Sequence, residues 1–254
     1  EFKPQNRDQL KTAVDLWVSD NETALSTYGE INSWNVSLIT DLSYLFSGKN
    51  TFNDDLSSWD VSNVTNMSQM FIGASSFNGD ISTWNVSSVT TFYKFLQHAS
   101  SFNGDISSWD VSSVTNMDYM FSSYISSFNQ DLSDWNVSNV TSMIGMLEGA
   151  TNFNSDISGW NVSNVLDMRF LFSNTSSFNV DISSWDISNV IEMAAVFGGN
   201  IGLNDVHKCA INATWSSNSA WPYDWSEYCN QAPISNDQQI SIYEDSEVGS
   251  TFSV

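Results

Sequence analysis

The chain has 254 residues, of which 41% are apolar, so it is long enough to bury the core of one large domain or two small ones. Its 29 Asp and Glu against 7 Lys and Arg give a formal net charge of −22. Because such a surface repels polyanions, nucleic acid and anionic membranes are excluded as favoured partners. No apolar run approaches the roughly 18 to 20 residues that cross a bilayer, so no membrane span is predicted.

Residues 1–30 are predicted to form an N-terminal cap that contains a helix. An apolar stripe at helical spacing runs through Leu10, Ala13, Val14 and Trp17. Asn6 and Gln9 precede it as a variant of the capping box, which predicts a helix over residues 6–18.

Residues 31–205 consist of seven tandem repeats of about 25 residues. Tryptophan recurs with a spacing of 25 or 26 residues at Trp34, Trp59, Trp84, Trp109, Trp135, Trp160 and Trp185. Phe-Asn pairs keep the same period, and an Asp follows two residues after each Asn. Such a strict period predicts a solenoid, in which each repeat buries its apolar residues against its neighbours.

Apolar spacing predicts one strand and one helix in each repeat. The L-x-x-L-x-L spacing of a leucine-rich repeat is kept by Leu56, Trp59, Val61 and Val64. Trp59 and Val61 lie two residues apart, so both are expected to point inward from a short strand. A spacing of about two helical turns follows at Val64, Met67, Met70 and Phe71. The predicted fold is α/β: a leucine-rich-repeat-like, right-handed solenoid of seven 25-residue coils, each with a short parallel strand and a short helix, with N- and C-terminal caps.

Residues 206–230 are predicted to form a Trp-rich C-terminal cap, closed by a disulfide between Cys209 and Cys229. The alternative is two unrelated buried thiols. Residues 231–254 resemble neither cap nor repeat and are predicted to be an extended tail, a linker or an inter-subunit strand. The residues expected to mediate assembly through this tail are Ile240, Ile242, Tyr243 and Phe252.

The repeat motif W-(D/N)-V-S-x-V-T-x-M-x-x-M-F-x-x-A-x-x-F-N-x-D resembles the tandem repeats of BspA-like leucine-rich-repeat surface proteins of bacteria and microbial eukaryotes. The resemblance covers about residues 28–230 and includes the segment around Cys209, Trp221, Trp225 and Cys229. It implies a secreted or cell-surface protein of adhesion and interaction, with no fixed ligand and no catalytic residues.

A polar column follows each tryptophan and is a candidate binding surface. Its expected binding residues are Asp60, Asn85, Asp110, Asn136, Asn161 and Asp186. Asp never occupies this position in two neighbouring repeats, which avoids like-charge contacts. The two interpretations are a hydrogen-bonded ladder that holds the register and a docking surface for a partner or glycan.

A second column contains Asp in six consecutive repeats: Asp55, Asp80, Asp105, Asp131, Asp156 and Asp181. Neighbouring carboxylates repel, so something must satisfy them. One interpretation is that each Asp accepts backbone N–H groups in its own turn. The alternative is calcium held between the repeats by these carboxylates. Apart from calcium, no cofactor is predicted.

The sequence also contains N-x-(S/T) sequons outside the first polar column. The candidate glycosylation sites are Asn21, Asn63, Asn66, Asn139, Asn174 and Asn212. No enzyme is predicted, since the chain shows no nucleophile motif or phosphate-binding glycine loop.

These features predict an extracellular structural or adhesive surface glycoprotein that self-associates or binds a protein partner. One form of this prediction is a subunit of a filament assembled through the C-terminal tail. The alternative is a monomeric recognition module that binds a glycan or a protein on its polar sheet face.

Overall fold

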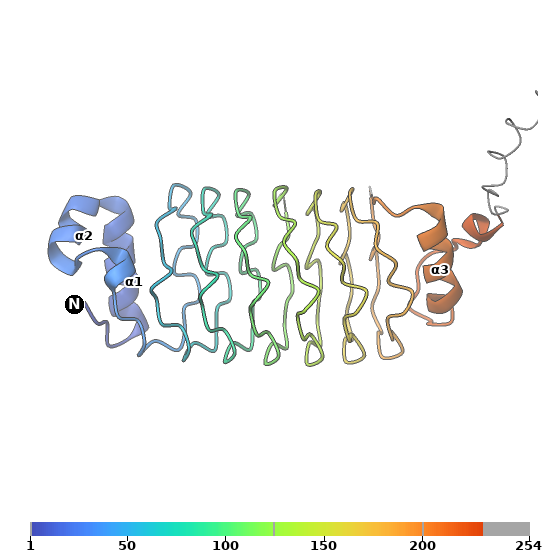
Figure 1. Cartoon of the computed structure of the whole chain (residues 1–254), viewed down its shortest axis with the longest axis horizontal. Coiled ribbons are helices and arrows are strands. Elements are labelled where there is room, and N and C mark those ends of the chain that lie inside the picture. The colour runs from blue at the N-terminus through green and yellow to red at the C-terminus, as the bar shows by residue number, and fades with distance from the viewer. Residues whose placement is uncertain (1, 124, 200, 231–254) are drawn as a thin grey trace, which may run out of the picture.

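The computed structural model describes residues 2–123, 125–199 and 201–230. Two helices, α1 (Arg7–Ser19) and α2 (Asn21–Tyr28), and the 3-10 helix η1 (Ile31–Ser33) come first. A long row of turn-rich repeats follows, and α3 (Asp205–Trp215) and the 3-10 helix η2 (Ser226–Cys229) come last. Figure 1 shows the repeats as successive loops side by side, with helices at both ends of the row.

The predicted fold class is wrong, because the repeats contain neither of its two elements. Between residues 34 and 203, the described residues form turns and bends, with no helix and no strand. Neighbouring repeats are joined by six isolated parallel bridges, one at each junction. The leucine-rich-repeat solenoid of strand-plus-helix coils is therefore not the architecture of this chain.

The expected helix is absent because its backbone donors are used between repeats. In the second repeat, four alternate N–H groups donate to carbonyls of the third repeat over 2.7–3.3 Å, from Met67, Gln69, Phe71 and Gly73. Of the N–H groups between them, those of Met70 and Ile72 bond to carbonyls three residues back, and that of Ser68 bonds to Oδ1 of Asn66. An α-helix needs each N–H to reach the carbonyl four residues earlier, so this alternation excludes one. All six junctions have the same four bonds.

The expected strand is absent because turns use its backbone groups. The Trp59 N–H donates to the Leu56 carbonyl, and the Ser62 N–H donates to Oδ1 of Asp60. Both bonds stay within one repeat, so they leave no ladder of the kind that defines a sheet. This part of the repeat reaches its neighbour through side chains: Nε1 of Trp59 donates to the Ile31 carbonyl at 2.8 Å.

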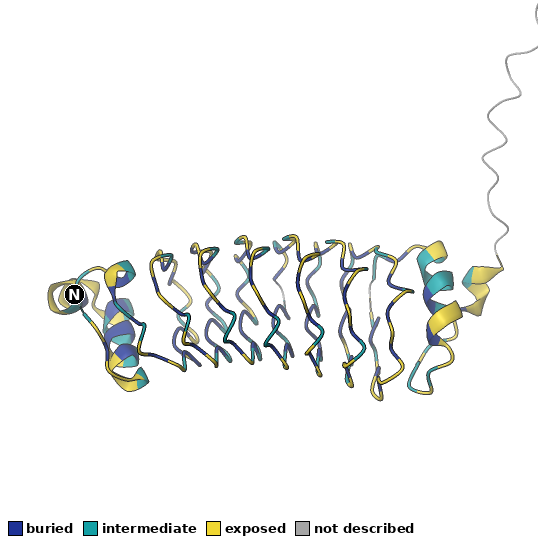
Figure 2. Ribbon diagram, turned by 60° about the horizontal axis from the view of Figure 1, so that its bottom comes forward, coloured by how far each residue is buried: buried dark blue, intermediate teal, exposed yellow. Residues whose placement is uncertain are grey.

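The core consists of aromatic and aliphatic columns that run along the row. The seven repeat tryptophans are at most 4% exposed, which confirms the prediction that they point inward. The phenylalanines from Phe52 to Phe178 stack with centroid distances of 5.9–6.3 Å between neighbouring repeats. Figure 2 shows buried segments recurring in every repeat, with exposed residues concentrated at the turns.

At each end of the row, a side chain supplies the hydrogen-bond donor or acceptor that the unpaired backbone group needs. At the first repeat, Arg7 of α1 donates to the outward carbonyl of Ser43. At the last repeat, the outward N–H of Phe197 donates to the Tyr223 hydroxyl at 3.1 Å. The ladder is directional, so one end needs a donor and the other needs an acceptor.

The helix predicted over residues 6–18 is α1, which Asn6 caps by accepting the Gln9 N–H. In the C-terminal segment, Cys209 and Cys229 form the predicted disulfide. The Trp215 ring of α3 stacks on Trp185 with centroids 6.3 Å apart, which continues the tryptophan column beyond the last repeat.

Candidate recognition face

One side of the row is built from the backbone ladder, and we call it the ladder face. In the first repeat it comprises residues 40–48. The equivalent residues in the other repeats are 65–73, 90–98, 115–123, 141–149, 166–174 and 191–199. Backbone bonds hold these segments together at every junction, and some side chains add further bonds between repeats.

The ladder face carries a column of left-handed residues, five of which have large side chains. The column consists of Tyr44, Gln69, Lys94, Tyr119, Gly145, Phe170 and Ala195, with φ between 53° and 60°. This conformation costs an L-residue about 1–2 kcal/mol, and glycine adopts it freely. Glycine nevertheless occupies only one of the seven positions. Six of the seven residues therefore keep a strained backbone conformation.

Two of the three cations of residues 31–205 lie on the ladder face. Of the seven Lys and Arg, only Lys94 and Arg169 lie between residues 50 and 207. The Lys94 ammonium lies 5.2 Å from the Tyr93 ring centroid and 5.4 Å from the Tyr119 centroid. Tyr93 and Tyr119 are half-buried, so their rings are supported and still accessible. The ladder face is therefore the part of the repeats where aromatic and cationic groups meet.

Gly145 allows Tyr119 to lie across the next repeat. A Cβ at Gly145 would come within 2.6 Å of two Tyr119 ring carbons, so only glycine leaves room for the ring. Partial burial raises the pKa of Tyr119, and the nearby Glu148 and Asp118 carboxylates raise it further. Partial burial also raises the pKa of Glu148. The tyrosine is thus a fixed, neutral platform at physiological pH.

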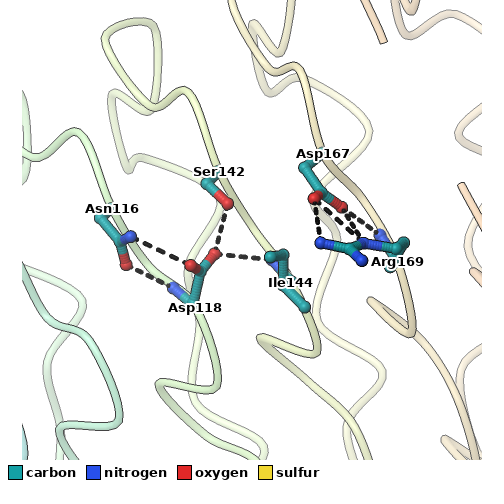
Figure 3. Close-up of polar contacts among 6 residues, drawn as sticks. All are labelled: Asn116, Asp118, Ser142, Ile144, Asp167 and Arg169. Carbon is teal, nitrogen blue, oxygen red and sulfur yellow. Dashed lines mark hydrogen bonds and ion pairs between the residues drawn. The ribbon is translucent and has the colours of Figure 1, made fainter. Parts of the chain in front are cut away.

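Two carboxylates order the polar part of this surface, as Figure 3 shows. Asp118 is buried and accepts hydrogen bonds from Asn116 Nδ2, Ser142 Oγ and the Ile144 N–H, at 3.0, 2.6 and 2.9 Å. In the sixth repeat, Nη2 of Arg169 pairs with Asp167 at 2.7 Å. These bonds hold the groups in place before any partner arrives, which reduces the entropic cost of binding.

The edge of the ladder face changes from polar to apolar along the row. Five exposed threonines occupy one position in successive repeats: Thr40, Thr65, Thr90, Thr115 and Thr141. Each of the last four donates its hydroxyl to the preceding threonine carbonyl at 3.1–3.3 Å. Leu166 and Ile191 take the same position in the last two repeats, where they are 45% and 69% exposed.

The family comparison identifies the repeats without assigning them an activity. The chain matches a family described as "Mycoplasma protein of unknown function, DUF285" over residues 17–126 and 106–208. The chain belongs to this family. Among curated proteins, none matches the chain. The two DUF285 matches together span all seven repeats, so the ladder face lies within the family region.

The predicted binding column lies outside the ladder face, and Oδ1 of each member is already used. All six residues from Asp60 to Asp186 are exposed, and Oδ1 of each accepts the N–H of the serine two residues later at 3.0–3.2 Å. The hydrogen bonds from Ser62 lower the pKa of Asp60. These bonds are local to each repeat, and the binding role of the column stays a prediction.

Two open clefts lie near the ends of this column, where helical segments replace a further repeat. A cleft of about 590 Å³ lies between the last repeat and α3 and includes Asp186, Ile191 and Asn218. A second, of about 490 Å³, includes Trp34 and Asp60. The middle members of the column, Asn85 to Asn161, line neither of these two clefts.

The six-Asp column satisfies its charges by hydrogen bonds within each repeat. Oδ1 of every member accepts the N–H two residues later at 2.8–3.0 Å. At Asp105, the bonds from Ser107 lower the pKa despite the neighbouring Asp131 carboxylate. The local interpretation is therefore confirmed. Within residues 2–123, 125–199 and 201–230, no group of three or more His, Cys, Asp or Glu is placed to hold a metal ion.

The glycosylation candidates differ in how far the fold uses their side chains. Asn21, Asn63, Asn139 and Asn174 are exposed. Asn66 and Asn212 are half-buried. Oδ1 of Asn212 accepts bonds from Trp221 Nε1 and the Trp225 N–H. Glycosylation of these six residues stays a prediction.

The proposed assembly residues Ile240, Ile242, Tyr243 and Phe252 lie outside the described residues. None of the helices in the described part of the chain combines the length and apolar character that crossing a bilayer requires. The disulfide indicates an oxidising, extracellular environment.

Sequence reasoning missed the ladder face, because the side chains of its left-handed column do not repeat. One signal was present in the sequence: both cations between residues 50 and 207 fall within the segments where the motif varies most.

Proposed function

We propose that the chain is an extracellular adhesion or recognition protein that binds a macromolecular partner on its ladder face. The observation that carries the proposal is the left-handed column, where Tyr44, Tyr119 and Phe170 stand in a conformation that favours glycine. Their retention costs stability, and binding is the benefit that explains it.

The composition of the ladder face supports a large partner. Tyrosine and arginine are the residues that most often dominate binding energy at interfaces. Tyr44 and Phe170 are 47% and 38% exposed, so they are free to contact a partner. The face spans all seven repeats, which is the extent of a protein or a polymer and not of a small metabolite.

The BspA-like resemblance and the disulfide support the extracellular part of the proposal. A secreted or cell-surface location suits a chain with a disulfide, and adhesion is the activity that the resemblance implies. The filament suggested by the sequence depends on residues 231–254, which lie outside the described residues, so it stays a prediction.

Attachment of cells to the immobilised protein tests the proposal. We expect the double variant Tyr119→Ala, Phe170→Ala to lose most attachment and to keep its unfolding temperature. The matched control is Leu25→Ala, Val206→Ala, which truncates exposed apolar residues in α2 and α3, outside the ladder face. Equal attachment by both double variants would refute the ladder face as the binding surface.

A further inference from the structure

Lys94 makes no ion pair with a described residue, although the chain has 29 acidic residues. Five of the seven cations are paired: Arg7, Lys11, Lys49, Arg169 and Lys208. The other cation without such a pair is Lys3, near the start of the chain. Lys94 lies in the third repeat, at the centre of the aromatic part of the ladder face.

The lysine is held in place by rings and backbone. Its Nζ lies over the Tyr93 and Tyr119 rings, and its backbone N–H donates to the Asp118 carbonyl at 2.8 Å. Contacts of an ammonium with ring faces leave its N–H donors unused. Among the described residues, none accepts a hydrogen bond from Nζ of Lys94 or bonds to the hydroxyls of these two tyrosines.

The nearby carboxylates are directed elsewhere. Asp118 accepts bonds from Asn116, Ser142 and Ile144, and it is buried beneath the surface. Glu148 lies beside Gly145, near enough to Tyr119 to raise its pKa, and makes no ion pair with Lys94. The outward part of the Lys94 cluster, which we define as Tyr93, Lys94 and Tyr119, therefore offers three ammonium donors and two hydroxyls without a described carboxylate partner.

We propose that the Lys94 cluster binds a carboxylate of a partner protein, from an Asp or Glu side chain or a chain terminus. This inference rests on the ladder face being the recognition surface. The complementary charge identifies the group: an ammonium between aromatic rings gains a charge-assisted hydrogen bond from a carboxylate. The net charge of −22 selects against an acidic polysaccharide, whose many charges the rest of the surface repels. A protein presents a single acidic group without that cost.

A random peptide library displayed on phage tests the proposal. Selection is carried out on the immobilised full chain, on Lys94→Met and on Lys208→Met. The last is the matched control, because Lys208 lies 4.3 Å from the Tyr228 ring centroid, in the C-terminal segment. We expect peptides selected on the full chain and on Lys208→Met to be enriched in Asp and Glu at a fixed position, and this enrichment to be lost on Lys94→Met.

The affinity of one selected peptide gives the quantitative result. We expect Kd to rise about tenfold or more when Lys94 becomes Met or when the acidic residue of the peptide becomes its amide. Lys94→Arg should retain binding, and added salt should weaken it. Circular dichroism checks that each variant remains folded.

Three outcomes would overturn the proposal. Equal acidic enrichment on Lys94→Met is the first, and selection without any acidic enrichment is the second. The third is Lys94-dependent binding of polygalacturonate without acidic peptides, which would identify a glycan. If the selected peptides bind Lys94→Met as well as the full chain but do not bind the double variant Tyr119→Ala, Phe170→Ala, only the carboxylate inference is wrong. If the peptides bind both variants as well as the full chain, the proposal that the ladder face is the recognition surface is wrong as well.

Discussion

The two sides of each repeat are bonded to the neighbouring repeat by different groups. On the turn side, residues 53–64 and their equivalents, side chains make the bonds: Asp or Asn closes each turn, and tryptophan reaches the preceding repeat. On the ladder face, the backbone makes them, with four N–H bonds at every junction. Each side is equally regular in its hydrogen bonding.

This difference explains why one side repeats in sequence and the other varies. A side chain that closes a turn or bonds a neighbour cannot change freely, so the turn side has Trp, Asn and Ser in every repeat and Asp in all but the first. Where the backbone makes the bonds, the outward side chain can vary without breaking them. The position of Lys94 accordingly contains six residue types in seven repeats.

The largest expected effect is loss of a turn-side anchor. Trp109→Ala removes a ring that is 3% exposed and the bond from its Nε1 to the Ile81 carbonyl. Truncation of a buried aromatic residue costs about 3–5 kcal/mol. Tyr44→Ala on the ladder face should change the free energy of unfolding by less than about 1 kcal/mol. Chemical denaturation of both variants measures this, and equal losses would remove the distinction between the two sides.

Removal of the disulfide tests how the open edge of the ladder is protected. Cys209→Ser with Cys229→Ser opens a loop with a sequence separation of 20 residues, which should cost roughly 3 kcal/mol. The Phe197 amide, bonded to Tyr223, should then exchange faster by hydrogen-exchange mass spectrometry. The Trp185 amide bonds within its own repeat and should change less. A larger change at Trp185 would contradict the directional ladder.

Glycine substitutions measure the strain on the ladder face. Gln69→Gly should stabilise the chain by about 0.5–1 kcal/mol, because relief of a φ of 59° exceeds the added entropy of the unfolded state. Gln97→Gly is the matched control, since both side chains bond across one junction and Gln97 is not among the positive-φ residues. It should destabilise by a similar amount. Thermal unfolding of the two variants measures these changes. If both glycine substitutions destabilise the chain, the left-handed column is not strained.

The smallest expected effect concerns one turn-side carboxylate. Asp105→Ala should cost about 0.5–1 kcal/mol by leaving the Ser107 N–H without its acceptor, and Asp105→Asn should cost less. Bonds from Ser107 lower the pKa of folded Asp105. Its contribution is therefore present above the unfolded pKa of about 3.9 and is lost as pH falls through the folded pKa. Urea titrations at several pH values check this, and identical pH profiles for Asp105→Ala and the parent chain would refute it.

Sequence alone predicted the buried residues and turn bonds of the turn side but wrongly gave it a strand, and it failed for the ladder face. The period, the inward tryptophans, α1 and the disulfide follow from residue types that recur or pair. The spacing of Val64, Met67, Met70 and Phe71 suggested a helix, but it reports only which residues face the core. Left-handed residues at two positions of each repeat give the same burial. Glycine marks the second position in four repeats, but Gln69 and Lys94 at the first position are ordinary helix formers.

The central claim is that the ladder face binds a partner and the turn side maintains the fold. Measuring cell attachment and folding on two sets of single variants tests it most directly. One set changes Gln69, Lys94, Tyr119 and Phe170 to alanine, and the other changes Asp60, Asn85, Asp110 and Asn161. We predict that the ladder-face set lowers cell attachment and leaves protease resistance unchanged, whereas the turn-side set lowers protease resistance. Loss of attachment confined to folded turn-side variants, with the ladder-face set unaffected, would contradict the account.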